Sequence, residues 1–461
     1  MTPNEVLNKW LAEHEQELID VTRQVLQIDT IEGPAEPNAP YGSGNRKALD
    51  MMLSYAESCG MKTTDLEGHL GYADFGSGDR LVMTLGHLDV VPVGPGWKHE
   101  PFGAEIDGGY IYARGAVDDK GPTIASFFAL RAIKECFPDL NSRFRAAFGC
   151  DEESGFGCVE RYAKTEEPPT YGIAPDSGWP CYHGEKGIGD LLVSVKVPES
   201  NFQITSLVGG QRPNIVIDQC SALVHVGESV REEVETKVSE YWDKNITTSW
   251  AGNTLHIEAT GKAAHGSTPF YGDNAATRIV RMLLEVSPLE TKEFLDDLLN
   301  AFHPSGVGIG IHGRDDATGD LTANVGIVSF EDGAVKLLVN VRYPATWKGE
   351  ELHAMCSKHL AKLGPLWSFE VERDSPSLYF PLDHPLIKVV VEAYREATGD
   401  QKEPGTMGGG TYARAIPNTV SVGTGWLGDG DAHQTDERVA IESLKKMSRI
   451  YAAILYRLAT V

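Results

Sequence analysis

The chain contains 461 residues, which is long for one ordinary domain and predicts two or three compact units with a substantial core. Lys and Arg total 41 against 66 Asp and Glu, giving a formal charge of −25, and no stretch gathers basic side chains into a patch. Nucleic acid is therefore not expected as a partner. No apolar run approaches the roughly 18 residues that a membrane helix requires, so a membrane protein is not expected either.

The compartment is indicated by the N-terminal segment and by the cysteines. Residues 1–20 are acidic and amphipathic, whereas a secretory signal would be basic and then continuously apolar. The seven cysteines are odd in number and scattered without paired spacing, which is typical of reduced thiols rather than of a disulfide framework. We therefore expect a cytoplasmic protein.

The first part of the chain predicts helices and strands in alternation. Thr2, Pro3 and Glu5 supply an N-cap, a first-turn proline and a capping-box acid, and apolar residues at helical spacing follow as far as Val25. We expect one helix there, later helices at about 46–59 and 124–137, and strands at 70–75, 81–85, 144–148 and 172–174. This alternation predicts a mainly parallel sheet flanked by helices.

The middle of the chain, from about 184 to 380, has a different character. β-rich stretches such as GDLLVSVKV and AVKLLVNVRYP alternate there with a helical stretch near 274–284. The C-terminal part returns to the first style, with a helix at 385–398, a strand at 419–423 and a final helix at 441–458. We therefore expect an α/β fold in which a discontinuous core domain, residues 1–184 and 381–461, carries an inserted α+β domain, residues 185–380.

Several predicted strands end in residues that can bind a cation. GHLDVVP places His87 and Asp89 after an apolar run, and RGAVDDKGP places Asp118 and Asp119 side by side in a loop that opens a helix. Ligands bind at the carboxyl ends of strands in open α/β sheets, and adjacent carboxylates repel unless a cation or a proton compensates them. Taken singly, these motifs are equally compatible with a satisfied histidine and a solvated acidic turn.

Three later motifs repeat this placement. FGCDEESG carries Asp151, Glu152 and Glu153 after a strand, IAPDSGWP carries Asp176, and GDGDAHQTDE carries His433. The consecutive acids are also compatible with decoration of a helix N-terminus, which the helix dipole favours. Because five strand ends present His, Asp or Glu, we predict that they form one shared metal site.

The types of ligand indicate the ion. Imidazoles and carboxylates without thiolates suit zinc, manganese or cobalt better than magnesium or calcium, which prefer oxygen ligands only. Five ligands exceed what one open catalytic zinc uses, whereas two ions that share a bridging carboxylate would use all five. A sixth acid would then remain free to transfer protons.

GHLDVVP, RGAVDDKGP, DEESG, PDSGWP and AHQTDE closely resemble the motif set of the di-zinc exopeptidase and aminoacylase family, which includes succinyl-diaminopimelate desuccinylases, aminoacylases and carnosinases. Within this metallopeptidase family the chain resembles the bacterial PepV-type dipeptidases most, because HGEKGIG, GKAAHGSTP with GDNAA, NVRYP and GGGTYAR also occur in order. The match covers nearly the full length. It implies that the core domain is catalytic and that the inserted domain is a lid.

The resemblance implies the ligands of two divalent ions, which we expect to be Zn²⁺, with Mn²⁺ or Co²⁺ as alternatives. One ion would be held by His87, Asp118 and Asp176. The other would be held by Asp118, Glu153 and His433, so that Asp118 bridges the two. Activity is expected to depend on these ions.

Two further acids receive roles from the resemblance. Glu152 would be the general base and acid, which takes a proton from the attacking water and returns it to the leaving amine. Asp89 would accept a hydrogen bond from the far nitrogen of His87 and so fix its tautomer. The resemblance also implies a cis peptide bond between Asp118 and Asp119.

The inserted domain is expected to contribute substrate contacts. His265 in AAHGSTP would stabilise the tetrahedral oxyanion. Asn214 in RPNIVID and Arg342 in NVRYP would hold the substrate, and Arg342 is suited to bind a terminal carboxylate through two hydrogen bonds. The family usually has a proline soon after this asparagine, whereas here Ile-Val-Ile follows. A glycine-rich segment would offer N–H groups to the same carboxylate, although a plain tight turn is also compatible; its residues are Gly408, Gly409, Gly410 and Thr411.

The leading interpretation is a cytoplasmic, monomeric dinuclear zinc metallopeptidase that hydrolyses dipeptides or short peptides with a free amino terminus. Asp176 favours it, because family members that act on free amino termini tend to carry Asp there and desuccinylase members tend to carry Glu. The monomer is expected because the long insert resembles the enlarged lid of PepV-type monomers. One alternative is an N-acyl amino acid amidohydrolase of the aminoacylase or desuccinylase type. Another is a catalytically silent metal-binding relative, which would have no chemical need of Glu152.

Overall fold

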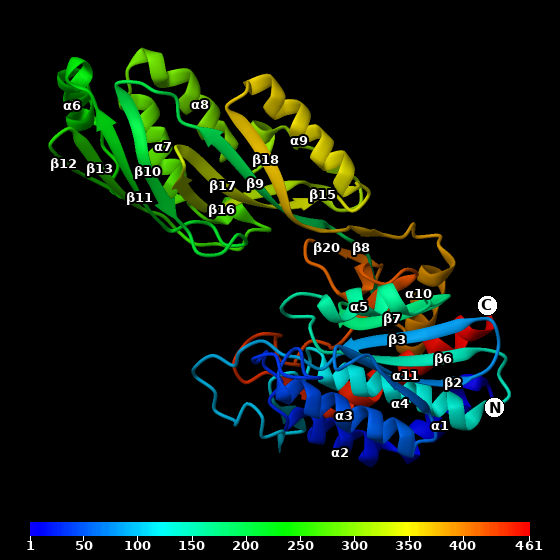
Figure 1. The fold of residues 1–461 in the computed structure, drawn as a ribbon. Helices are drawn as coiled ribbons and strands as arrows, with labels where there is room; N and C mark the ends of the chain where they lie inside the picture. The colour runs from blue at the N-terminus through cyan, green and yellow to red at the C-terminus, as the bar shows by residue number, and fades with distance from the viewer. The chain divides into compact units, whose positions relative to one another are not determined.

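The computed structural model describes residues 1–461, and the chain divides into two compact units (Figure 1). Unit 1 consists of Met1–His183, Phe380–Thr406 and Thr411–Val461. Unit 2 consists of Gly184–Tyr379 and Met407–Gly410, so it interrupts unit 1 in the sequence. No helix combines the length and the apolar character needed to cross a bilayer.

Unit 1 contains seven α-helices and a set of short and long strands. The helices are α1 (Pro3–Glu13), α2 (Glu15–Leu26), α3 (Ser43–Ser58), α4 (Lys120–Cys136), α5 (Gly157–Thr165), α10 (Pro385–Thr398) and α11 (Ile441–Thr460), with the 3₁₀ turn η5 (Tyr412–Arg414). The strands are β1 (Lys62–Asp65), β2 (Leu70–Gly76), β3 (Leu81–His87), β4 (Glu105–Asp107), β5 (Tyr110–Tyr112), β6 (Arg143–Gly149), β7 (Tyr171–Ser177), β21 (Thr419–Gly423) and β22 (Arg438–Ala440). Strands β8 (Cys181–Glu185) and β20 (Gly405–Met407) run across the points at which the chain passes from one unit to the other.

The main sheet of unit 1 has the strand order β1-β2-β6-β3-β7-β21-β8. The central strands β6, β3, β7 and β21 run parallel to one another, whereas the strands at both edges are antiparallel. All seven residues of β3 are buried, as expected of a central strand that is covered on both faces. The prediction of a mainly parallel sheet flanked by helices is confirmed, with antiparallel strands added at its edges.

Helices cover both faces of this sheet (Figure 1). On one face, Leu70 and Tyr72 of β2 share an apolar cluster with Val159 of α5. On the other face, a side chain in place of Gly71 would meet Leu49 of α3 at 2.9 Å. Helices α4 and α11 pack against each other and against β3. Because both faces are closed, the strand ends are the part of the sheet that remains accessible to a ligand.

The N-terminal segment forms two helices where one was predicted. Helix α1 begins with the predicted capping box of Thr2 and Glu5. His14 then leaves helical geometry, with φ −113° and ψ 13°, and α2 begins at the next residue. Trp10 and Leu18 are buried on either side of this break. The apolar spacing therefore continues across the break and does not reveal it.

Unit 2 contains four α-helices and eleven strands. The helices are α6 (Arg231–Glu240), α7 (Ala275–Val286), α8 (Lys292–Ala301) and α9 (Gly349–Leu363), with the 3₁₀ turns η1 (Glu228–Val230), η2 (Pro269–Tyr271), η3 (Leu289–Thr291) and η4 (Val307–Ile309). The strands are β9 (Gly187–Lys196), β10 (Phe202–Gly209), β11 (Gln219–Val226), β12 (Ile246–Ala251), β13 (Thr254–Thr260), β14 (Arg314–Asp315), β15 (Gly319–Asp320), β16 (Thr322–Glu331), β17 (Ala334–Tyr343), β18 (Trp367–Ser375) and β19 (Leu378–Tyr379).

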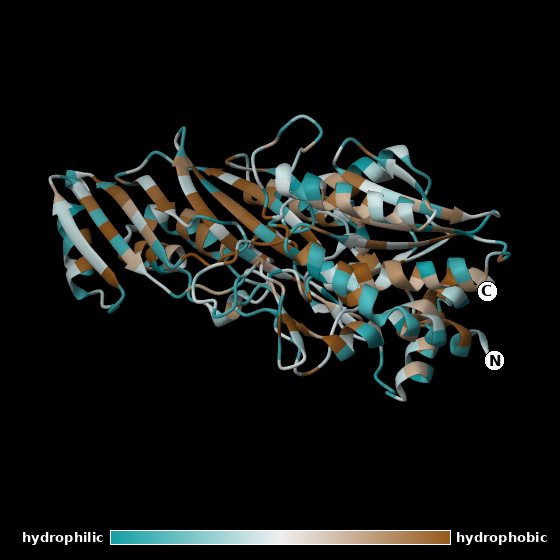
Figure 2. Cartoon of the chain, turned by 90° about the horizontal axis from the view of Figure 1, so that it is seen from below, coloured by the Kyte–Doolittle hydropathy of each residue, from teal (hydrophilic) through white to brown (hydrophobic).

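The core of unit 2 lies between one antiparallel sheet and its helices. The strand order is β12-β13-β11-β10-β16-β17-β9-β18. Every second residue of β11 is buried, and Figure 2 shows the matching alternation of hydrophobic and hydrophilic residues along the strands. Helix α7 packs on the buried face, where Ile279 and Leu283 join Val224 and Leu255 in one apolar cluster. The α+β character expected of the middle of the chain is confirmed.

Candidate metal centre

Neighbouring strands of the unit 1 sheet bring the predicted ligands to one edge. Strand β3 ends at His87, β7 contains Asp176 next to its last residue, and β6 ends just before DEESG. These strands are parallel neighbours, so their carboxyl ends meet. The other two predicted ligands lie in loops, Asp118 before α4 and His433 before β22.

Asp118 lies between two histidines. Its Oδ1 atom is 3.1 Å from Nε2 of His87, and its Oδ2 atom is 3.1 Å from Nε2 of His433. The same Nε2 atom of His433 is 3.0 Å from Oε1 of Glu153. One carboxylate thus presents a separate oxygen to each imidazole.

Glu152 and Asp176 complete the cluster. Each offers an oxygen to a group of potential ligand atoms that lie within 4.8 Å of one another and that includes a nitrogen of His87. Only the main-chain N–H of Glu152 takes part in a hydrogen bond, to Asp89 at 2.9 Å, so the carboxylate itself is free to exchange a proton. The structure therefore brings the five predicted metal ligands and the predicted base together.

The loop that carries Asp118 is fixed by contacts with β3 and α4. The peptide bond between Asp118 and Asp119 is cis, as the resemblance implied. Oδ2 of Asp119 accepts hydrogen bonds from the main-chain N–H of His87 at 3.2 Å and from the hydroxyl of Thr123 at 2.8 Å. A side chain in place of Gly86 would meet Oγ1 of Thr123 at 1.9 Å. The glycine therefore allows the end of β3 to approach the start of α4.

Asp89 joins two of the ligand segments. Its Oδ2 atom accepts hydrogen bonds from the main-chain N–H groups of Glu152 at 2.9 Å and Glu153 at 3.0 Å. Nδ1 of His87 lies 3.0 Å from the main-chain carbonyl oxygen of Asp89 and 3.5 Å from its carboxylate. The carboxylate was the expected acceptor, but the carbonyl is nearer because the carboxylate is turned toward the DEESG segment. A proton on Nδ1 leaves the Nε2 lone pair available to a cation.

A buried ion pair, absent from the predicted site residues, links the ligand segments. Arg114 and Glu437 are each 1% exposed, and Nη1 of the arginine is 2.7 Å from Oε2 of the glutamate. Oε1 of Glu437 accepts hydrogen bonds from the main-chain N–H groups of Val117 at 3.0 Å and Asp118 at 3.2 Å. Arg114 also donates to the carbonyl of Gln434, the residue after the second ligand histidine, at 3.1 Å.

The same guanidinium reaches the segment that follows β3. Its Nη2 atom donates to the carbonyls of Pro92 and Val93, both at 3.3 Å. Arg114, which belongs to the segment of Asp118, therefore contacts two further chain segments that each carry a predicted ligand. The sequence contained a signal for the importance of this ion pair, because Arg114 lies inside the motif RGAVDDKGP and Glu437 lies inside the motif AHQTDE.

The crowded charges shift one another's pKa values. Burial lowers the pKa of His87, but hydrogen bonds, chiefly to Asp118, outweigh burial and raise it well above its usual value. Hydrogen bonds to Asp118 and Glu153 raise the pKa of His433 to about 10. Burial, followed by neighbouring carboxylates, raises the pKa of Asp176. Such a group of acids takes up protons or binds cations.

The donor set fits two divalent cations. Two imidazole nitrogens and several carboxylates, with no thiolate, form a mixed nitrogen and oxygen set that zinc, manganese and cobalt all accept. The two oxygens of Asp118 face the two different imidazoles, so this residue has one oxygen for each ion. His87 has potential ligand atoms of both Asp176 and Glu153 within 4.8 Å, and His433 contacts Glu153 and Asp118.

The substrate contacts predicted for the inserted segment gather within unit 2. The segments of His265 and Asn214 are adjacent, because the N–H of Gly266 donates to the carbonyl of Asn214 at 2.7 Å. Nδ1 of His265 accepts a hydrogen bond from the main-chain N–H of Ser267 at 3.2 Å, which assigns the proton of the neutral ring to Nε2. Partial desolvation lowers the pKa of His265, and the charge of Arg342 lowers it further. His265 therefore presents a neutral N–H donor.

Arg342 is buried and joined to the glycine-rich segment. Its Nε atom donates to Oδ1 of Asn340 at 3.1 Å, and its Nη1 atom donates to the carbonyl of Gly408 at 3.2 Å. Thr411 lies at the start of η5, where its hydroxyl accepts a hydrogen bond from the N–H of Ala413 at 3.2 Å. The contact to Arg342 uses a carbonyl, so the N–H groups that were predicted to bind a carboxylate remain a prediction.

A family model and full-length relatives match the chain. The model described as Peptidase family M20/M25/M40 matches residues 83–457. A Staphylococcus haemolyticus protein that is named provisionally as a dipeptidase is 34% identical over 463 residues, covering 97% of this chain and 98% of its own length. A Bacillus subtilis protein with the same provisional name is 34% identical over 464 residues, with coverages of 96% and 97%.

Solved structures share the fold at low sequence identity. Human carnosine dipeptidase 1 has 14% identity and a TM-score of 0.57, with 100% of both chains covered. The dipeptidase Dug1p from Saccharomyces cerevisiae has 14% identity and a TM-score of 0.58, also with full coverage. Aminoacylhistidine dipeptidase from Vibrio alginolyticus has 15% identity and a TM-score of 0.57, with coverages of 94% and 96%. At these identities the likeness concerns the fold alone.

Proposed function

The chain belongs to peptidase family M20/M25/M40, as its motifs predicted, and from this premise we propose that it is a dinuclear metallodipeptidase acting on short peptides with a free amino terminus. The observation that supports two ions is the placement of Asp118, whose two oxygens face His87 and His433 separately. Full-length relatives named provisionally as dipeptidases support this substrate class over N-acyl amino acids.

The proposed chemistry centres on Glu152. When bound, the two ions would polarise the peptide carbonyl and make a water more acidic. Glu152 accepts the proton of the attacking water, because its carboxylate has no other hydrogen-bond partner, and then donates that proton to the leaving amine. Asp89 holds Glu152 in place through the main-chain N–H and orients His87 through Nδ1.

Substrate binding is assigned to side chains of unit 2. His265 donates its Nε2–H to the oxygen that becomes negative as the carbonyl is attacked. Arg342 binds the terminal carboxylate, together with Asn214 and the N–H groups of the segment Gly409, Gly410 and Thr411. Contacts to both ends of the substrate would restrict the enzyme to short peptides.

The test is a substrate panel with the metal-loaded protein. We expect hydrolysis of dipeptides and little hydrolysis of longer peptides or N-acyl amino acids. Exhaustive chelation is expected to abolish activity, and one added divalent ion is expected to restore it. Faster hydrolysis of N-acyl amino acids would identify an amidohydrolase instead, and activity that survives chelation would refute the metal mechanism.

Three properties accompany this proposal. We expect zinc as the resident ion, since the mixed imidazole and carboxylate set suits it. We expect a monomer, and a solution mass twice that of the 50.2 kDa chain would contradict this. We expect a cytoplasmic location, which fractionation of the source cells would test.

A further inference from the structure

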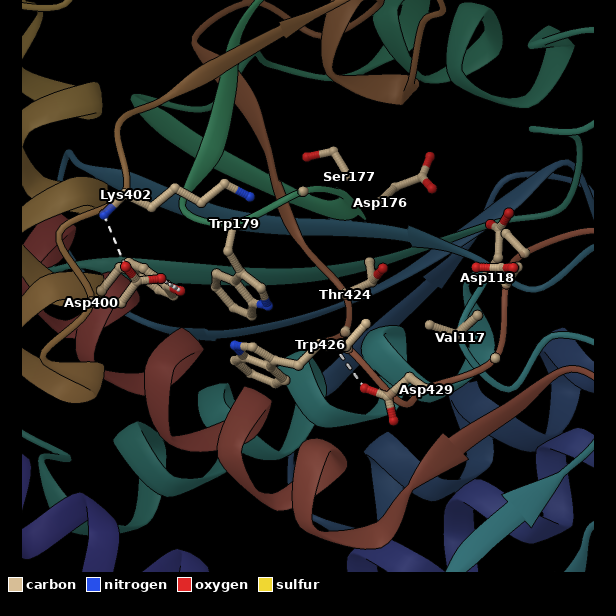
Figure 3. Close-up of a pocket in the computed structure, with 17 residues that line it drawn as sticks. Val117, Asp118, Asp176, Ser177, Trp179, Asp400, Lys402, Thr424, Trp426 and Asp429 are labelled. Atoms are coloured by element: carbon tan, nitrogen blue, oxygen red, sulfur yellow. Dashed lines mark hydrogen bonds between the residues drawn. The ribbon is translucent and has the colours of Figure 1, made fainter.

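Unit 1 contains a cavity of about 500 Å³ that begins at the metal ligands and extends away from them (Figure 3). Asp118 and Asp176 line one end, and Asp400 and Lys402 line the other. Every residue of the lining belongs to unit 1. A substrate bound at the metal centre can therefore extend a side chain into this space.

One wall of the cavity is aromatic. Trp179 is only 3% exposed and stacks on Trp426, with ring centroids 5.1 Å apart and an interplanar angle of 19°. Trp179 also stacks on Tyr394, with centroids 5.2 Å apart and an angle of 15°, and on Tyr451, with centroids 5.6 Å apart and an angle of 27°. With Nζ of Lys446 also 4.2 Å from the centroid of the Trp426 ring, these contacts fix the aromatic wall of the cavity rigidly.

Most acids in the cavity already have donors within the protein. Asp400 accepts hydrogen bonds from the main-chain N–H of Lys402 at 3.0 Å and from a tyrosine hydroxyl at 2.8 Å. Asp429 accepts from the main-chain N–H of Trp426 at 2.8 Å and from a second main-chain N–H at 2.7 Å. Asp431 is exposed to solvent. Away from Asp118 and Asp176, the buried hydrogen-bonding capacity that remains in the cavity therefore belongs to donors.

Two such donors and one exposed cation lie around the cavity. The indole Nε1–H of Trp179 and the hydroxyl of Ser177 are buried and have no hydrogen-bond partner in the chain. Buried polar groups are nearly always satisfied, so two unpartnered groups in one cavity indicate a ligand with acceptor atoms. Lys402 is exposed, and in Figure 3 its ammonium end points toward Trp179 and Ser177.

We propose that this cavity binds the side chain of the N-terminal residue of the substrate and prefers side chains that end in a carboxylate or a carboxamide. The methylene groups would lie along the cavity wall that includes Trp179 and Trp426, and the terminal oxygens would accept hydrogen bonds from Ser177, Trp179 and Lys402. The inference rests on the proposed function, in which Arg342 binds the other end of the peptide. The two divalent ions would compensate the adjacent acids, which removes their repulsion of an acidic side chain.

The test compares glutamyl-alanine, glutaminyl-alanine and leucyl-alanine as substrates of the metal-loaded full-length protein. We expect the first two to be hydrolysed with the higher kcat/KM. Lys402→Met should lower kcat/KM for glutamyl-alanine roughly tenfold, the effect of one charge-assisted hydrogen bond, and that for leucyl-alanine less than about twofold. Trp179→Phe keeps an aromatic ring and removes the N–H together with the five-membered ring of the indole, so it should weaken both acceptor-bearing substrates more than leucyl-alanine.

Lys164→Met is the matched control, because it removes an exposed lysine of unit 1 from α5. Equal losses for glutamyl-alanine and leucyl-alanine, or no loss, in Lys402→Met would overturn the proposal. If no dipeptide is hydrolysed, the proposed function fails, and calorimetric titration with L-glutamate and L-leucine still decides the specificity of the cavity. Tighter binding of L-glutamate that is lost in Lys402→Met supports it, and equal binding refutes it.

Discussion

The two units hold their functional residues by different means. In unit 1 the predicted ligands come from segments far apart in the sequence, and buried groups such as Arg114, Glu437 and Asp119 join these segments. In unit 2, His265 is exposed, and its ring orientation depends on Ser267, two residues away. The metal centre is therefore set by long-range contacts, whereas the His265 donor is set locally. The effects of substitutions on the proposed activity should therefore differ between the two units.

The largest expected effect is that of Glu152→Ala. This change should lower kcat by roughly 10²- to 10⁴-fold, because it removes the group that transfers the proton, while the metal content stays unchanged. Turnover and metal content are measured on the same preparation, with Glu160→Ala in the exposed part of α5 as the control. Comparable turnover with full metal content would remove Glu152 from its proposed role.

His265→Ala tests the locally fixed residue. Loss of one donor to the developing oxyanion should lower kcat by roughly 10²-fold, and metal affinity should not change. His303→Ala is a closely matched control, because His303 in unit 2 makes the same pair of contacts to the serine two residues later. An equal effect of the two substitutions would show that His265 acts only on the structure of unit 2.

Glu437→Gln tests the long-range frame of the metal centre. The substitution keeps the size of the side chain but removes the charge that pairs with Arg114 and weakens the acceptor for the N–H of Asp118. We expect the affinity for the divalent ions to fall roughly 10- to 100-fold, measured by competition with a chelating dye. Glu442→Gln, on the exposed start of α11, is the control. A lower unfolding temperature with unchanged metal affinity would assign Glu437 a role in stability alone.

The smallest expected effect concerns Asp315, a carboxylate that accepts hydrogen bonds from main-chain N–H groups and hydroxyls of unit 2. Burial raises its pKa, but hydrogen bonds from the main-chain N–H groups of Thr318 and Thr346 and from their hydroxyls outweigh burial and lower it. A carboxylate with a lowered pKa stabilises the fold above its unfolded pKa, and this stabilisation is lost as the pH falls through its folded pKa.

Asp315→Asn should therefore reduce the free energy of unfolding at neutral pH by about 1 kcal/mol or less, since the group is partly exposed. The difference from the wild type should shrink as the pH approaches 3, which denaturant titrations at several pH values would measure. Asp316→Asn, at an exposed neighbouring position, is the control. A difference that stays constant with pH would mean that the charge of Asp315 contributes nothing.

Elements with local start and stop signals could be predicted closely. Helix α10 spans Pro385–Thr398, the predicted range, because a proline opens it and Gly399, with φ 73°, ends it. The break at His14 has no such signal, because the apolar spacing is the same on both sides. Periodicity therefore identified the buried face of the N-terminal segment but not its division into two helices.

Three of the predicted metal ligands come together because parallel strands place their ends at one edge of the sheet, whereas Asp118 and His433 come from loops. Their supporting contacts could not be predicted in the same way. Arg114 and Glu437 are separated by 323 positions, and no spacing rule relates an arginine in one motif to a glutamate in another. The rotamer of Asp89 decides which of its oxygens accepts the hydrogen bond from His87. The main-chain N–H groups of DEESG fix that rotamer, so the GHLD motif alone does not predict it.

The long-range hydrogen bonds of Arg114 have a consequence for the order in which the protein folds during synthesis. Its partners Gln434 and Glu437 lie near the end of the chain, whereas the strands of the unit 2 sheet, from β9 to β18, are consecutive in the sequence. Unit 2 can therefore fold on the ribosome while unit 1 still lacks its last segment. The proposed metal centre becomes complete only when the segment with His433 has emerged, so we expect that a chain that terminates before this segment does not hold both ions.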